Sequence, residues 1–413
     1  MKEIVVIGAG PAGMMAAISA AAGGNRVTIL EKKDKVGRKL SITGKGRCNL
    51  TAAVDREGLI KGMPGNGRFL YSCFSEFSNQ DLIEFFARHG LKVKVERGQR
   101  VFPESDDAGQ VVEVLLRAMR EAGVRIINRC EVRGLCLAGG RICGVDTRQG
   151  TLAADAVVVA TGGLSYPGTG STGDGYGWAE GLGHKIIGPR PGLVPLVVAE
   201  TWVRRLQGLA LRNTRATSFD AQGRKINKDF GEMLFTHFGL SGPIILSMSR
   251  DIAQYIYQEG KTVRIELDLK PALSEEKLDE RLQRDLNRQS RKLFKNALGD
   301  LLPAKMLPVV VDLSGIDPTK PCHQVSRAER QGLGQLLKRL TLTVTATRPI
   351  AEAIVTAGGV NVKEVDPRTM QSRLVPGLFF AGEILDVDGY TGGYNLQACF
   401  STGYVAGRSA ART

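Results

Sequence analysis

Short apolar runs near the start of the chain alternate with small residues. EIVVI at residues 3–7 precedes the glycine-rich GAGPAG at residues 8–13, and VTIL at residues 27–30 ends in Glu31. The stretch between them is rich in Ala and Met, which is typical of a helix, whereas the short apolar runs are typical of buried strands. The sequence therefore predicts a strand–helix–strand unit at the N-terminus.

The glycine-rich turn of this unit has the spacing of a dinucleotide fingerprint. Gly8 permits a tight turn, Gly10 lets the backbone approach a pyrophosphate, and Gly13 lets the helix lie close to the strand. The helix N-terminus offers free N–H groups to phosphates, and the acid after the second strand can accept hydrogen bonds from a ribose. The predicted dinucleotide contacts are Gly8, Gly10, Pro11, Ala12, Gly13, Glu31 and Lys32.

Two later strand ends indicate which dinucleotide binds. A predicted β-meander over residues 131–153 leads into the apolar run 156–160, which ends in Thr-Gly-Gly, and residues 375–383 read VPGLFFAGE. These strand ends resemble the second and third fingerprints of the glutathione-reductase-like FAD fold, in which the last acid, here Glu383, lies by the ribityl chain. Non-covalent FAD is therefore predicted, with further contacts at Val132, Thr161, Gly162, Gly163, Gly382 and Glu383.

No second G-x-G-x-x-G follows a predicted strand. We therefore expect no separate nicotinamide-binding domain. If NAD(P)H reduces the flavin, it is expected to bind transiently and to leave before the substrate enters.

Three further segments carry a more specific resemblance. They read GRKLSITGKGRCNLT at residues 37–51, LFTHFGLSGP at residues 234–243 and AGEILDVDGYTGGYNLQ at residues 381–397. With the fingerprints, they resemble a bacterial family of FAD-dependent oxidoreductases whose members are labelled aminoacetone-oxidase-like, BaiN-like (a proposed bile-acid reductase) or ribosomal-RNA dihydrouridine synthase. The likeness runs from end to end, but family membership does not fix a substrate.

The resemblance implies an α/β architecture, a glutathione-reductase-like Rossmann FAD domain with an inserted β-barrel domain that carries a helical segment. The N-terminal part of the FAD domain would be residues 1–188, and its C-terminal part residues 346–413. The insert would be residues 189–345, with the helical segment at about 272–330.

The residue pattern of the insert agrees with this division. Strand-like runs occur at residues 193–198, 214–219, 263–269 and 340–347. Residues 274–302 are predicted to be helical, with Ser274 as the N-cap. At helical spacing, one arc of that helix would carry a basic stripe, separate from an apolar arc of leucines. The stripe consists of Arg281, Arg284, Arg288, Arg291, Lys292 and Lys295.

The charge of the chain makes this stripe relevant. The 413 residues carry a net charge of +14, and residues 190–345 supply more than half of it, with 25 Lys and Arg against 17 Asp and Glu. The stripe has two interpretations, a solvated face or a surface for an RNA backbone, and ribosomal RNA is the partner that the resemblance suggests.

The segment that follows the ribose acid supplies candidate flavin contacts. Glycines there permit close backbone approach, and basic side chains can neutralise phosphates of the cofactor or of a substrate. The predicted contacts are Arg38, Lys39, Gly44, Gly46, Arg47 and Cys48. Near the C-terminus, a glycine-rich turn that opens the last helix would direct N–H groups at the flavin. Its predicted contacts are Gly392, Gly393, Tyr394, Asn395 and Leu396, although Asn395 and Gln397 have the alternative of capping the helix.

Two residues are candidate catalytic groups. Cys48 is either a small packed residue or the proton donor to a carbon that receives hydride, and its basic neighbours are expected to lower its pKa. His237, in the insert that should cover the flavin, is either a packed histidine or an acid–base residue. No second His or carboxylate stands at ligand spacing from it, so no metal site is expected.

Three functions remain open at this stage. They are reduction of an activated C=C bond in RNA to give dihydrouridine, oxidation or reduction of a small amine, amino-ketone or steroid-like enone, and a non-catalytic flavoprotein. The first is favoured modestly because of the basic insert. The seven cysteines form no C-x-x-C pair, and no apolar run is long enough to span a bilayer, so a cytoplasmic protein with reduced thiols is expected.

Overall fold

The structure describes residues 1–412, apart from the side chains of residues 258 and 259. Within these residues, five parallel strands form one central sheet. Its order is β19-β10-β1-β2-β6. The strands are β1 (Glu3–Ile7), β2 (Arg26–Glu31), β6 (Arg125–Asn128), β10 (Ala156–Val159) and β19 (Leu378–Phe380). In this computed structural model, the sheet belongs to a first unit made of residues 1–192 and the chain from residue 350 onward, and residues 193–349 form a second unit.

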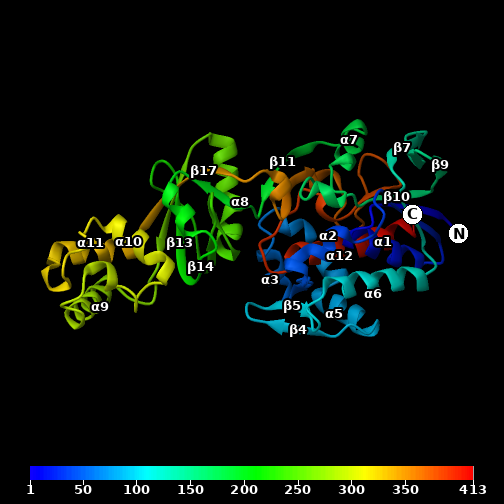
Figure 1. Ribbon diagram of the computed structural model, residues 1–413. Helices are drawn as coiled ribbons and strands as arrows, with labels where there is room; N and C mark the ends of the chain where they lie inside the picture. The colour runs from blue at the N-terminus through cyan, green and yellow to red at the C-terminus, as the bar shows by residue number, and fades with distance from the viewer. Residues whose placement is uncertain (413) are drawn as a thin grey trace. The chain divides into compact units, whose positions relative to one another are not determined.

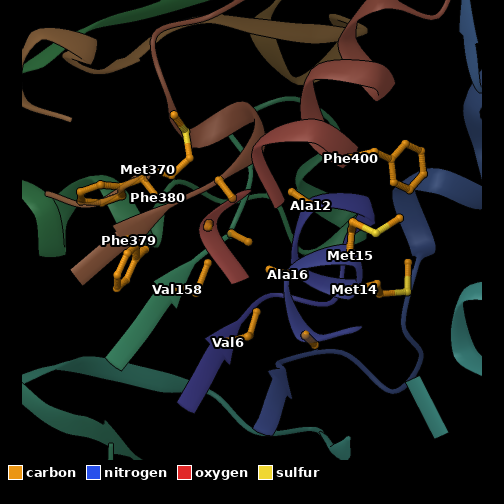
Figure 2. Packing of buried hydrophobic residues seen from close by; sticks show 14 of the residues in the cluster. Val6, Ala12, Met14, Met15, Ala16, Val158, Met370, Phe379, Phe380 and Phe400 are labelled. Carbon is orange, nitrogen blue, oxygen red and sulfur yellow. The ribbon is translucent and has the colours of Figure 1, made fainter. Parts of the chain in front are cut away.

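The apolar pattern of the sequence explains the sheet. All side chains of β10, which reads AVVV, are buried, as expected for a parallel strand covered on both faces. Val6 of β1 lies in register between Ile29 of β2 and Val158 of β10. Val6 and Val158 belong to the same buried cluster as Phe379 of β19 (Figure 2). The predicted Rossmann-type unit and the two later strand ends are confirmed.

Two helices from opposite ends of the sequence lie side by side next to this sheet, α1 (Pro11–Ala21) and α12 (Tyr394–Ala410) (Figure 1). They approach closely because α12 has glycines at the contact. A Cβ atom added to Gly403 would lie 2.2 Å from the carbonyl oxygen of Ala12, and one added to Gly407 would lie 2.1 Å from that of Ala16. The backbone of α12 therefore rests directly on the backbone of α1.

The remaining elements of the first unit surround the sheet. The predicted β-meander is confirmed as β7 (Val132–Ala138), β8 (Arg141–Thr147) and β9 (Gly150–Ala153). A small sheet contains β3 (Thr51–Ala52), β4 (Val93–Glu96) and β5 (Arg100–Pro103), and β11 (Ile186–Gly192) pairs with β18 (Val355–Val360). The other helices are α2 (Arg38–Ile42), α3 (Arg56–Lys61), α4 (Tyr71–Glu76), α5 (Asn79–Arg88), α6 (Ala108–Glu121) and α7 (Asp174–Gly181).

The second unit is built on a closed β-barrel with the order β12-β15-β14-β13-β16-β17. Its strands are β12 (Leu196–Val198), β13 (Ala210–Phe219), β14 (Lys225–Phe235), β15 (Gly239–Ser241), β16 (Val263–Asp268) and β17 (Leu340–Thr347). Alternate residues of β16 are buried, which gives the barrel a core of its own. Its helices are α8 (Pro243–Glu259), α9 (Glu275–Arg288), α10 (Leu307–Ser314) and α11 (Arg327–Lys338). Within residues 1–412, none of the helices combines the length and the apolar composition that crossing a bilayer requires.

The predicted helix over residues 274–302 is correct only in its first half. Ser274 caps α9 by accepting a hydrogen bond from the Lys277 N–H, but the helix ends at Arg288. Beyond it the backbone pairs with a distant segment. The Cys322 N–H donates to the Lys292 carbonyl at 2.9 Å, and the Phe294 N–H donates to the Lys320 carbonyl at 2.8 Å. Because these bonds replace helical ones, the six basic residues do not form one stripe on a continuous helix.

Two side chains of that supposed stripe also have local carboxylate partners. Arg281 contacts Asp285 at 2.6 Å, and Arg288 forms an ion pair with Asp300. Arg291, Lys292 and Lys295 are exposed but follow the end of the helix. The predicted RNA-binding stripe is therefore corrected to a dispersed set of basic residues.

The close contact of α12 with α1 yields a stability prediction. Gly407→Ala should lower the free energy of unfolding by about 1–3 kcal/mol, because the new methyl group must push the two helices apart. Urea denaturation followed by circular dichroism measures this loss. Gly177→Ala in α7 is the matched control, since its added Cβ meets no atom within 4 Å, and it should be neutral or slightly stabilising. Equal stability of the two variants would contradict the proposed role of the contact.

Candidate functional site

The glycine-rich turn after β1 leaves open space at the start of α1. Gly8 has a φ of +96°, and a Cβ there would lie 2.6 Å from the Ala160 carbonyl oxygen. A Cβ on Gly10, in contrast, would meet no protein atom within 4 Å. Gly10 is the N-cap of α1 and provides no side-chain cap, so the helix N-terminus is left to other hydrogen-bond acceptors. This cradle fits a pyrophosphate group.

The acid at the end of β2 is anchored beside the same turn. One carboxylate oxygen of Glu31 accepts the Ala9 N–H at 3.0 Å, and the other accepts the Lys33 N–H at 2.8 Å. Lys32 is turned towards α7, where its ammonium group contacts Asp174 at 2.6 Å. Glu31 is thus fixed at the edge where a ribose would be expected, whereas Lys32 is engaged in an ion pair.

A second polar group lies at the ends of β10 and β19. The ammonium group of Lys39 donates to Ser165 Oγ at 2.6 Å and to Glu383 Oε2 at 2.7 Å. Nearby, Thr161 has a buried hydroxyl oxygen without a hydrogen-bond partner among the described residues. The strand ends of the second and third fingerprints therefore come together, and they retain an unsatisfied polar atom of the kind that a bound ligand would complete.

Glycines permit close contacts around these strand ends. Gly162 has a φ of +74°, and a Cβ on Gly163 would lie 2.3 Å from Thr356 Oγ1. Gly382 has a φ of +77°, and its added Cβ would lie 2.7 Å from that of Ala12 on α1. Val132 is buried at the start of β7. The predicted contact residues of the three fingerprints thus lie in one unit, and, apart from Gly10, the fingerprint glycines stand where larger side chains would collide.

The segments 43–51 and 389–397 also meet. The side-chain amide of Asn49, with its oxygen facing Gly393, accepts the Gly393 N–H at 3.1 Å. Gly393 has a φ of +98°, and a Cβ there would lie 2.5 Å from the Thr51 carbonyl oxygen. Asn395 accepts the Gly389 N–H at 2.8 Å and donates to the Gly389 carbonyl at 3.0 Å, so it closes the turn and does not cap α12.

The other predicted residues of these two segments have varied surroundings. Gly44 and Gly46 have positive φ values, and Gly392 lies against the ring of Tyr394. Burial raises the pKa of the Tyr394 phenol. Leu396 is half-buried.

Two predicted phosphate contacts are paired with carboxylates. Arg38 contacts Asp34 at 2.9 Å on the surface. Arg47 donates to Glu96 at 2.5 Å and to Asp106 at 2.6 Å, and these hydrogen bonds raise the pKa of its guanidinium group. Both positive charges are therefore already neutralised within the protein.

The expectation that basic neighbours lower the pKa of the Cys48 thiol is wrong. Cys48 is fully buried, and burial raises the pKa of its thiol to about 12, since the apolar surroundings disfavour the charged form. The thiol therefore stays protonated at neutral pH, and the basic residues next to it in sequence do not activate it.

His237 belongs to the barrel unit, in the turn between β14 and β15. It is exposed, and its ring packs edge-on against Phe238 with the ring centroids 4.9 Å apart. This histidine is therefore not the packed core residue of the alternative interpretation.

Sequence reasoning missed Ser165 and Thr356. Ser165 donates to Glu383 Oε1 at 2.9 Å, and the Thr356 N–H donates to the same oxygen at 2.7 Å. The glycine-rich run at residues 162–175, just after a fingerprint strand, is a signal that indicates Ser165. Thr356 lies in an unremarkable apolar stretch, and the sequence offers no comparable signal for it.

Comparisons with known proteins agree with this geometry. The family model described as the HI0933-like protein Rossmann domain matches residues 2–409. The 3-dehydro-bile acid delta(4,6)-reductase of Clostridium scindens is 35% identical, over 100% of this chain and 99% of its own length. The ribosomal RNA dihydrouridine synthase of Escherichia coli is 32% identical, over 97% of this chain and 96% of its own length. The ribosomal RNA dihydrouridine synthase of Haemophilus influenzae is 31% identical, over 100% of this chain and 99% of its own length.

Solved structures show the same fold at low identity. A 3-ketosteroid-delta4-(5alpha)-dehydrogenase from Rhodococcus jostii RHA1 has a TM-score of 0.55 at 17% identity, covering 100% of this chain and 97% of its own. A flavocytochrome c3 fumarate reductase in an open conformation has a TM-score of 0.52 at 16% identity, covering 100% of this chain and 78% of its own.

Fold, fingerprints and relatives together define an FAD-dependent oxidoreductase. The chain belongs to the HI0933-like family, and the end-to-end resemblance predicted from the sequence is confirmed.

The open space at Gly10 leads to a prediction about cofactor binding. Gly10→Val should abolish FAD retention, because its side chain would occupy the pyrophosphate cradle, while a Cβ at this position meets no protein atom within 4 Å. Absorbance at 450 nm of the purified protein reports the bound flavin. Gly134→Val is the control and should stay yellow, since a Cβ added to Gly134 also meets no protein atom within 4 Å. A yellow Gly10→Val protein would refute the placement of the pyrophosphate.

Proposed function

We propose that this protein saturates a carbon–carbon double bond conjugated with a carbonyl group, and that uridine in ribosomal RNA is its substrate. The observation that carries the proposal is the pair of relatives that match the whole chain. One is named a delta(4,6)-reductase and the other a dihydrouridine synthase. Although their named substrates differ greatly in size, both names describe the addition of two hydrogens across a C=C bond.

The chemistry requires two groups from the protein in addition to the hydride, which bound and reduced FAD supplies. In uridine, the hydride adds to C6 and a proton adds to C5, so a hydrogen-bond donor must polarise the C4 carbonyl and an acid must deliver the proton. NAD(P)H is the proposed source of the electrons. It would bind transiently, since the described part of the chain has one dinucleotide-binding sheet.

The charge of the barrel unit supports an RNA substrate. Residues 193–349 contain 25 Lys and Arg against 17 Asp and Glu, a net charge of +8. A positive field of this kind attracts phosphate backbones and accelerates their encounter with the protein. Because bases in mature ribosomes are buried, ribosomal RNA with little bound protein is the proposed form of the substrate.

The substrate test uses purified holoenzyme, NADH or NADPH, and protein-free ribosomal RNA from a strain that lacks this protein. Liquid chromatography with mass spectrometry should detect dihydrouridine, formed only when both the enzyme and the nicotinamide are present. A 3-keto steroid with a conjugated C=C bond is assayed in parallel, since the relative with 35% identity favours that second candidate. Turnover of the steroid without any dihydrouridine would overturn the RNA proposal and support the small-molecule function.

Among the candidate acids, exposure favours His237 over Cys48. His237→Gln should slow substrate turnover by about 100-fold, the usual scale for a lost general acid, while leaving FAD content unchanged. Cys48→Ala should change turnover by only a few-fold, because the thiol is buried and holds its proton tightly. Single-turnover oxidation of the reduced flavin by substrate measures both variants. The opposite ranking would return Cys48 to the role of proton donor.

A further inference from the structure

A four-residue network joins distant parts of the first unit. Lys39 contacts both Ser165 Oγ (2.6 Å) and Glu383 Oε2 (2.7 Å). Glu383 Oε1 accepts from Ser165 Oγ at 2.9 Å and from the Thr356 N–H at 2.7 Å. Thr356 Oγ1 in turn accepts the Ser165 N–H at 3.1 Å. Both carboxylate oxygens of Glu383 are therefore held in defined directions.

The network lies where ligands bind to open parallel sheets. Glu383 follows β19 and Ser165 follows β10, and these strands are neighbours in the sheet. Lys39 comes from α2, shortly after Glu31 at the end of β2. Ligands of doubly wound sheets bind outside the carboxyl ends of the strands. The Lys39–Glu383 pair, separated by 344 positions in sequence, thus connects the segment after the first fingerprint with the third fingerprint at that edge.

The Lys39–Glu383 pair does not use its full hydrogen-bonding capacity within the protein. A carboxylate accepts about four hydrogen bonds and an ammonium group donates three. Within residues 1–412, Glu383 accepts three side-chain or backbone hydrogen bonds and Lys39 donates two. The side chains keep 22% exposure for Lys39 and 16% for Glu383. One donor site of Lys39 and one acceptor site of Glu383 therefore remain unused in a pair whose charged atoms are 2.7 Å apart, which suits a hydroxyl group because a hydroxyl both accepts and donates.

The ion pair between Lys39 and Glu383 is not explained by a gain in folding stability. Removing an ion pair from water costs several kcal/mol per ion, so a partly buried pair contributes little to stability compared with apolar side chains of similar size. The neighbouring Arg38 shows the contrast, since its 42% exposed side chain contacts Asp34 within the same surface turn. A charged pair held in place by two further residues is instead the arrangement expected for ligand recognition.

We propose that Lys39 is a positioning residue that holds Glu383 in the orientation needed to bind a hydroxyl of the polyol chain of FAD. Lys39 then serves the cofactor through Glu383 and not as a phosphate ligand. The two residues contribute to FAD affinity as one unit. This inference rests on FAD binding at the sheet edge and is independent of the identity of the substrate.

A double-mutant cycle tests the proposal. Lys39→Met, Glu383→Gln and the double variant are stripped of flavin, and FAD affinity is measured by quenching of flavin fluorescence. Each single change should weaken FAD binding about 10- to 100-fold, the range for losing a hydrogen bond to a charged group. The double variant should bind no more weakly than the weaker single variant, since either change alone already disables the unit.

A conservative variant and a surface variant serve as controls. Lys39→Arg should restore most of the affinity because a guanidinium group can still hold the carboxylate. Arg26→Met, which removes an exposed ion pair with Glu3 in the same unit, should bind FAD like the unmodified protein. Thermal unfolding of the flavin-free variants identifies any that fail to fold. Should Lys39→Met be one of them, Lys39→Gln, which retains a donor, takes its place in the cycle.

The outcomes separate this proposal from the proposed function. Additive losses in the cycle, or unchanged affinity in a folded Lys39 variant, would overturn the positioning role. A strong coupling together with failure to reduce any uridine would leave the positioning role intact while removing the RNA substrate.

Discussion

Direct backbone contact between α1 and α12 is the constraint on which the first unit depends. Gly403 and Gly407 bring the last helix against the carbonyl groups of Ala12 and Ala16. With α12 seated there, β19 pairs with β10, and Gly382 is fixed by a 3.0 Å hydrogen bond from its N–H to Thr402 Oγ1 on α12. The candidate cofactor edge is therefore assembled from both ends of the chain by a contact that tolerates no side chain.

The barrel unit shows how net charge differs from available charge. Several of its basic residues are used internally, since Arg330 binds Asp279 at 2.7 Å and Lys338 binds Asp268 at 2.7 Å. Arg291, Lys292 and Lys295 are exposed around a turn that is not helical. An RNA backbone would meet a diffuse positive field from this unit, not a ladder of phosphate contacts, so electrostatic attraction would favour encounter more than sequence recognition.

Local sequence rules predicted the features whose causes are local. The glycine turn at residue 8 and the apolar composition of β10 can be seen in the local sequence, and Ser274 caps α9 as its position indicated. Features set by distant contacts were beyond such rules. The helix after Ser274 stops early because its continuation pairs with residues 320–322.

In the candidate site, too, local features could be predicted from the sequence and distant contacts could not. The fingerprint residues could be identified from their spacing, but the partners of their side chains could not. Arg47 is neutralised by Glu96 and Asp106, and Cys48 is isolated from solvent by the fold around it. Lys39 was predicted as a contact, yet its partner Glu383 lies 344 positions away, a separation at which no periodicity in the sequence links two residues.

The discontinuous first unit has a consequence for synthesis on the ribosome. Proteins emerge from the N-terminal end, so the strands β1, β2 and β10 are made long before β19 and α12. The barrel unit, which is continuous in sequence, has its own core and can fold during that interval. Until α12 has emerged, the Rossmann sheet lacks an edge strand and the helix beside α1. A nascent chain therefore cannot complete its sheet before β19 and α12 have emerged, so cofactor capture is expected to follow the emergence of these two elements.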